Sequence, residues 1–125
     1  MTNRNKTKGS AWERAIVEAL RAAGWPYAER RLAGSTKDRG DIAGLPGIVI
    51  EAKNTASRNL AQWIDETEAE RVNAGAWLGV VWHKRTGRAS AADGYVTMTG
   101  AQFLALLGEA LDVQPQLPAE GGEAA

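Results

Sequence analysis

One apolar run in the middle of the chain ends in two charged residues, and it constrains the fold more than any other segment. Residues 48–53 read IVIEAK. A short, β-branched apolar run of this kind predicts a strand near the centre of a sheet. Because alternate residues of a strand point to the same face, Glu51 and Lys53 project together, roughly 7 Å apart. The run therefore predicts an acid and a lysine on one face of a buried strand.

A second acid precedes this strand and is separated from it by a turn. Asp41 follows Gly40, and residues 45–47 read LPG, which is typical of a hairpin loop. If the chain folds back about Pro46, Asp41 is expected directly opposite Glu51, with Cβ atoms about 5 Å apart. Two carboxylates suit Mg²⁺, and a nearby ammonium can orient or deprotonate a water.

A purely structural interpretation of the same residues is also available. Asp41 would then be a turn residue, and Glu51 and Lys53 would form a same-face ion pair worth roughly a few tenths of a kcal/mol. Against this interpretation, charges at the end of a buried strand are costly unless they are paired or bound to a metal.

The composition predicts one soluble domain. The chain has 125 residues, of which 44% are apolar and 24% are charged, and it contains no cysteine. The absence of cysteine removes disulfides and thiolate metal sites and fits a cytosolic protein. No apolar run is long enough to cross a membrane or to act as a secretion signal, so we expect no membrane partner and a cytoplasmic location.

Positive charge is concentrated in the first third of the chain. The formal net charge is zero, yet residues 1–40 carry nine Lys or Arg against four acids. A protein that is neutral overall can still bind phosphate with one basic face. A mixed, solvated surface is the alternative, and composition alone leaves both open.

Hydrophobic periodicity predicts the order α-β-β-β-α-β-β-α, with helices on both sides of a mixed sheet. We expect a flexible basic arm at 1–9, one domain at 10–111 and a disordered tail at 112–125. Helices are predicted at 10–23, about 60–73 and about 100–111, capped by Ser10, by Ser57 or Asn59, and by Thr99. Strands are predicted at 27–32, 40–43, 48–53, 77–82 and 94–98.

A further acid lies at the end of an apolar helix stripe. Glu13 shares one face of the first predicted helix with Ile16, Val17 and Leu20, a face that should meet the sheet. Glu13 also follows Ser10 at the spacing of a capping box, in which it would reach back to the Ser10 amide. The two roles are compatible and neither is excluded.

Several other polar and aromatic residues are expected to be structural or solvated. His83, the only histidine, begins a basic turn and is predicted to be a surface or phosphate-contacting residue. A solvated helix face is predicted for Gln62, Asp65, Glu66, Glu68 and Glu70. Trp63, Trp77 and Trp82 are candidates for interface anchors, although a core position is the simpler interpretation for each.

Five short motifs together resemble the archaeal-type Holliday junction resolvases and their phage relatives, which belong to the PD-(D/E)XK nuclease superfamily. The motifs are Lys8-Gly9-Ser10, Trp12-Glu13-Arg14, Gly34-Ser35, Gly40-Asp41-Ile42 and Ile50-Glu51-Ala52-Lys53. The resemblance implies an α/β, restriction-endonuclease-like fold, a mixed β-sheet flanked by helices. The chain departs from the superfamily pattern at Gly40, which replaces the proline before the aspartate.

The resemblance implies a Mg²⁺-dependent endonuclease of DNA recombination and repair that resolves four-way junctions, with Mn²⁺ as a substitute metal. Asp41 and Glu51 would be metal ligands, the main-chain carbonyl of Ala52 a third, and Glu13 would complete the acidic site. Lys53 would lie near the attacking water, and Ser35 near the scissile phosphate. Cleavage would leave a 5′-phosphate and a 3′-hydroxyl.

Basic residues would hold the backbone of branched DNA without reading its sequence. The candidates are Lys8, Arg30, Arg31, Lys37, Arg39, Arg58, Lys84 and Arg85. Symmetric cleavage of two strands needs two active sites, so we expect a homodimer, in the host cytoplasm if the protein is phage-encoded. Two alternatives stay open: a restriction- or repair-type nuclease that cuts flap or duplex DNA, and a non-catalytic junction-binding module.

Overall fold

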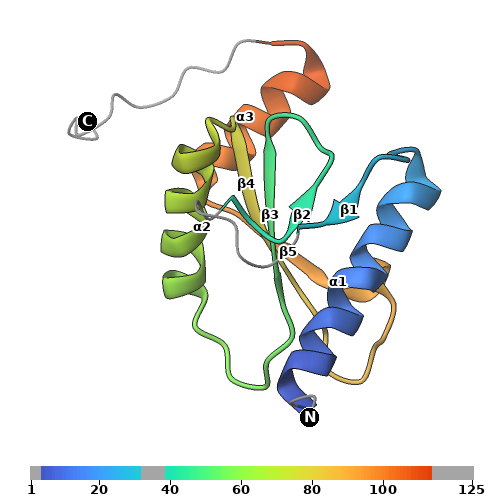
Figure 1. Cartoon of the computed structure of the whole chain (residues 1–125). Helices are drawn as coiled ribbons and strands as arrows, with labels where there is room; N and C mark the ends of the chain where they lie inside the picture. Colours follow the sequence, from blue (N-terminus) through green and yellow to red (C-terminus); the bar gives the residue numbers. More distant parts are fainter. Residues whose placement is uncertain (1–3, 32–38, 114–125) are drawn as a thin grey trace.

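The computed structural model describes residues 4–31 and 39–113, which form a mixed α/β fold (Figure 1). In chain order the elements are α1 (Arg4–Ala23), β1 (Glu29–Arg30), β2 (Ile42–Ala43), β3 (Ile48–Lys53), α2 (Leu60–Ala74), β4 (Leu78–His83), a 3₁₀ turn (Ala91–Asp93), β5 (Tyr95–Thr97) and α3 (Gly100–Leu111). None of the helices in these two segments has the length and apolar character needed to cross a membrane.

The strands form two small sheets rather than the single mixed sheet that we expected. β3, β4 and β5 lie side by side in that order, with β3 parallel to β4 and β4 antiparallel to β5. α2 supplies the crossover that parallel neighbours require. Within the described residues, β1 and β2 pair with each other as a separate antiparallel sheet, and each strand is two residues long.

Two helices cover opposite faces of the three-stranded sheet (Figure 1). α1 packs its apolar stripe, including Trp12 and Ile16, against the face that carries Ile50 and Val80. The indole N–H of Trp12 also donates to the Trp82 carbonyl at 3.0 Å, which ties α1 to β4. The other face of β3 carries Val49, Glu51 and Lys53, and it meets α2. An apolar layer therefore lies on one side of β3 and a partly polar layer on the other.

The first helix starts earlier than its sequence signals predict. α1 begins at Arg4, so residues 4–9 are helical rather than a flexible arm. Ser10 lies inside the helix and is not its N-cap. The other two caps are confirmed: Asn59 Oδ1 accepts from the Gln62 amide, and Thr99 Oγ1 accepts from the Gln102 amide. The Gly34-Ser35 motif and most of the predicted tail lie outside the described residues.

Gly40 has a conformation that explains why proline is absent there. Its φ is +90°, whereas the proline ring fixes φ near −65°. A Cβ at this position would lie 2.9 Å from Val49 Cγ1 and 3.0 Å from the Ile50 carbonyl oxygen. A residue with a side chain at position 40 would therefore be strained and would meet β3.

Replacing Gly40 with alanine should destabilise the fold and disturb the segment that carries Asp41. We expect Gly40→Ala to lower the free energy of unfolding by about 1–3 kcal/mol, because a non-glycine residue is strained at this φ and meets β3. Urea unfolding followed by circular dichroism measures the change. Gly100→Ala is the control, since no atom would contact its Cβ and it opens α3. An equal effect of both substitutions would contradict the expectation.

Candidate functional site

Asp41 is fixed to the outer edge of β3 by two hydrogen bonds. Its N–H donates to the Ile50 carbonyl at 2.9 Å, and its Oδ2 accepts from the Ala52 N–H at 2.8 Å. These two bonds go to the neighbours of Glu51 on either side, so Asp41 lies beside Glu51 at the edge of β3. The carboxylate of Asp41 accepts from the Ala52 amide, which a backbone carbonyl of a regular partner strand would otherwise bond.

Glu51 is the buried carboxyl of the site, with a relative exposure of 7%. Burial, followed by the nearby charge of Asp41 and by Glu70, raises the pKa of Glu51 to about 10. A hydrogen bond between the Glu51 and Glu70 side chains acts in the same direction. Such a bond requires a proton between the two carboxyls. The carboxyls of Glu51, Asp41 and Glu70 therefore lie so close together that a proton on Glu51 is favoured over its charged form.

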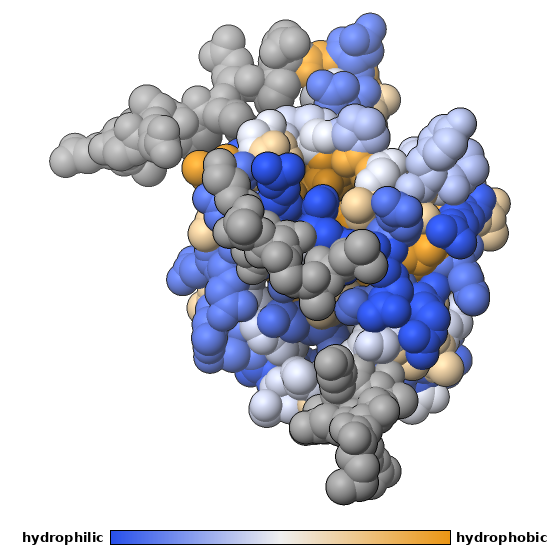
Figure 2. Space-filling model, in the orientation of Figure 1, coloured by the Kyte–Doolittle hydropathy of each residue, from blue (hydrophilic) through white to orange (hydrophobic). Residues whose placement is uncertain are grey.

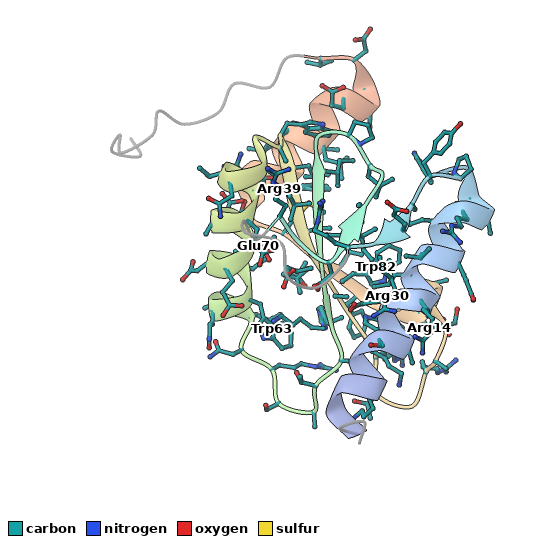
Figure 3. All side chains as sticks on the ribbon, viewed as in Figure 1. Arg14, Arg30, Arg39, Trp63, Glu70 and Trp82 are labelled. Atoms are coloured by element: carbon teal, nitrogen blue, oxygen red, sulfur yellow. The ribbon has the colours of Figure 1, made fainter. Side chains whose placement is uncertain are left out.

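Glu70 is the residue that the sequence analysis missed. It was expected on a solvated face of α2, but its relative exposure is only 4%. α2 turns Trp63, Thr67 and Glu70 toward the sheet, at the i, i+4, i+7 spacing of one helix face. Figure 3 shows Trp63 and Glu70 both projecting from α2 toward β3. That spacing from Trp63 was the available signal, and the surrounding acids at 65, 66 and 68 obscured it.

Lys53 lies on the same face as Glu51, as the strand alternation predicted. Its Nζ is 3.9 Å from Glu51 Oε2 and 3.7 Å from Glu66 Oε2, so Glu66 is not simply solvated either. The ammonium also lies 5.9 Å from the centre of the Trp63 ring. With a side chain that is 24% exposed, Lys53 is partly shielded yet still open to solvent.

Glu13 approaches Asp41 from α1. Asp41 contributes to a raised pKa of Glu13, second to burial, while Arg30 opposes the rise. Arg30 Nε lies 3.5 Å from Glu13 Oε1, and Arg30 Nη2 donates to Ser10 Oγ at 3.1 Å. The capping-box interpretation of Glu13 is wrong, because Ser10 is within the helix. Glu13 and Arg30 instead border the Asp41 edge of the sheet.

The donor set fits a hard divalent cation in chemical type. Asp41, Glu51 and Glu70 supply carboxylate oxygens, which Mg²⁺ prefers. The N–H and C=O of one strand residue point to the same edge, so the Ala52 carbonyl lies on the Asp41 side of β3, since the Ala52 N–H donates to Asp41. In residues 4–31 and 39–113, no group of three or more Asp, Glu, His or Cys is already arranged to hold a metal ion. The fit therefore rests on donor chemistry and on the surplus charge around Glu51.

Most of the predicted DNA-contacting residues lie on the surface. Lys8, Arg30, Arg39, Arg58 and Arg85 are exposed, whereas Arg31 and Lys84 are partly buried. Hydrophilic residues cover much of the face between α1 and α2 in the orientation of Figure 2. Arg14 and Arg30 lie together on the α1 side (Figure 3). Ser35 and Lys37 fall outside the described residues.

His83 is not the surface residue that we expected. Its relative exposure is 5%, and its Nε2 lies 3.0 Å from Thr97 Oγ1. It is the last residue of β4, on the same face as Lys53, so Trp63 and Tyr95 cover its ring. Burial and the nearby Arg58 lower the pKa of His83. The neutral form is therefore favoured, which suits a packing role.

Comparison with family models, with curated proteins and with solved structures found no match to this chain.

The raised pKa of Glu51 predicts a pH-dependent effect of Glu51→Gln on stability in EDTA. Glu51 stays protonated in the folded chain up to about pH 10 but ionises near pH 4.5 when unfolded. Its contribution is fully present below pH 4.5 and is lost as pH rises through 10. Glutamine does not titrate, so Glu51→Gln should gain stability relative to wild type between pH 5 and pH 9. Thermal unfolding across this range tests it, and a pH-independent difference would contradict it.

Proposed function

We propose that the protein is a Mg²⁺-dependent, structure-selective DNA endonuclease that resolves four-way junctions by phosphodiester hydrolysis. The observation that carries the proposal is the convergence of Asp41, Glu51 and Lys53 at one end of β3. Asp41 is bonded to the Ala52 amide, and Lys53 lies 3.9 Å from Glu51. Two carboxylates can hold a divalent cation, and a partly shielded ammonium can orient a water or offset charge on a phosphodiester. The choice of a four-way junction as the substrate rests on the motifs that resemble junction resolvases.

Each residue of the site has a defined task in this mechanism. Asp41, Glu51 and the Ala52 carbonyl would hold Mg²⁺, which when bound polarises the phosphate and lowers the pKa of a water. Lys53 orients that water or offsets charge on the phosphate as it is attacked. Glu70 holds the Glu51 carboxyl in position through their hydrogen bond.

The remaining residues bind and orient the DNA. Glu13 borders the site from α1, and Arg30 beside it offers a cation to a backbone phosphate. Exposed basic residues on other elements extend this phosphate-binding surface without reading base sequence. Cutting two strands of a junction symmetrically needs two such sites, for which a homodimer is the simplest assembly.

Removal of one carboxylate ligand tests the activity directly. We expect Asp41→Asn to reduce cleavage of a labelled four-way junction in Mg²⁺ by at least about 10²-fold, because one charged ligand is lost. Junction affinity in EDTA should remain, since phosphate contacts lie elsewhere. Asp65→Asn is the matched control, as it removes an exposed carboxylate of α2. Wild-type cleavage rates in Asp41→Asn would refute the assignment, and a preference for linear duplex would refute the junction substrate.

Metal binding itself should be measurable without DNA. A ligand that binds only the folded state stabilises it by about 2.7 kcal/mol at a concentration 100-fold above its Kd. Mg²⁺ or Mn²⁺ should therefore raise the Tm of wild type and of Asp65→Asn, but much less that of Asp41→Asn or Glu51→Gln. Thermal unfolding over a metal titration measures the effect. Equal metal responses in all four proteins would show that these carboxylates do not bind the ion.

A further inference from the structure

A row of three side chains crosses the sheet away from the acidic site. Lys53 of β3 is the register partner of His83 of β4, which is in turn the partner of Tyr95 of β5. Residues paired across adjacent strands share one face, and strands are about 4.8 Å apart, so the row spans about 10 Å. It begins at the proposed catalytic lysine and ends at the edge strand of the sheet.

Aromatic rings connect the two ends of this row. The Lys53 ammonium lies 5.9 Å from the centre of the Trp63 ring, whose centre is 5.7 Å from that of His83. The His83 ring in turn lies 5.5 Å from Tyr95, at an interplanar angle of 56°. Trp63 and His83 are buried, but Tyr95 is 43% exposed. The packed part of the row therefore supports an aromatic ring that is open to solvent.

A guanidinium lies beside the exposed ring, and two more basic residues follow His83 in the sequence. The Arg58 guanidinium, on the exposed segment before α2, lies 5.9 Å from the centre of the Tyr95 ring. Lys84 and Arg85 directly follow His83, and the Lys84 amide donates to the Lys53 carbonyl at 2.9 Å. A partly exposed aromatic ring beside a cation is a combination with which proteins bind nucleotides: the ring stacks on a base while the cation holds a phosphate.

We propose that Tyr95 and Arg58 form a stacking site for a nucleobase that is unstacked at a branch point, close to the phosphodiester that is cut. The proposal rests on the nuclease function proposed above and narrows its substrate class. Successive nucleotides of a stacked strand are about 3.4 Å apart along the helix. The span of about 10 Å between Tyr95 and Lys53 therefore corresponds to about three nucleotides of a stacked strand. A base within continuous duplex is already stacked on both faces, whereas a base at a branch point has a face free for Tyr95.

The test measures DNA binding in EDTA, which removes divalent metal, so that the probes are bound without being cleaved. The probes are a DNA fork with unpaired bases at the branch, a four-way junction and a linear duplex. In the first two, 2-aminopurine is placed at successive positions near the branch. We expect wild type to quench 2-aminopurine at one or two positions, and Tyr95→Ala to remove the quenching. Fork affinity should fall about tenfold, the scale of one base–aromatic stack, with duplex affinity unchanged.

The two tyrosines of the chain provide a matched control. Tyr27 is 82% exposed and precedes β1, near Gly44 at the opposite end of β3 from Lys53. Tyr27→Ala should bind every probe as wild type does, and Tyr95→Phe should retain the quenching. Because Tyr95 packs on His83, Tyr95→Leu preserves a bulky contact there, and Arg58→Ala leaves the packed rings intact. Both variants should fold and still lose fork affinity.

Three results would overturn the stacking site. They are unchanged quenching in Tyr95→Ala and Tyr95→Leu, equal losses on fork and duplex, and an equal effect of Tyr27→Ala. Failure of the nuclease proposal gives a different result: wild type would cleave none of the probes in Mg²⁺, while the quenching pattern in EDTA would be the same. The two proposals can therefore fail independently.

Discussion

The structure depends on the carboxyl of Glu51, which is buried at the end of a central run of apolar residues. A carboxylate in that position is costly unless its charge is compensated. The compensation available within the chain is incomplete, because Lys53 opposes only part of the effect of burial, Asp41 and Glu70. The folded protein therefore favours a proton on Glu51, or another cation beside it. A structural ion pair alone does not require this arrangement, since an apolar residue at 51 would fit the strand at lower cost.

This buried carboxyl also explains why α2 faces the sheet with an unusual set of residues. A helix that packs on a sheet normally presents an apolar stripe. α2 instead presents Trp63, Thr67 and Glu70, while two of its apolar residues, Leu60 and Val72, are exposed. Thr67 satisfies its hydroxyl within the helix by donating to the Trp63 carbonyl at 2.7 Å. Glu70 bonds to Glu51, and Trp63 covers Lys53, so the helix meets the polar face of β3 with matching polarity.

Local sequence signals predicted most helices and strands well. The features that they did not predict depend on contacts between residues that are far apart in the sequence. β3, β4 and the caps at Asn59 and Thr99 were predictable because strand alternation and capping depend on neighbouring residues. The start of α1 was not predictable, because the sequence does not distinguish a serine that caps a helix from one that lies within it. Whether Ser10 is a cap depends on whether the residues before it are helical. Nor was the way in which Asp41 is held predictable, because it depends on a positive φ at Gly40 and on a side-chain bond to the Ala52 amide. Glu70 and His83 were misjudged because their burial depends on which face of α2 meets β3 and β4.

The two faces of β3 make different contributions, and Asp41 connects them. The face with Ile50 packs on α1 through apolar contacts, which fix β3 relative to Glu13. The other face carries Glu51 and Lys53 and packs on α2. Because β3 is an edge strand of its sheet, Asp41 can bond along its open side and influence both Glu13 and Glu51, as the raised pKa of each shows. Had another strand of the three-stranded sheet covered this edge, backbone hydrogen bonds would have occupied the position of Asp41. The open edge is therefore what allows Asp41 to lie close to the carboxyls of both layers.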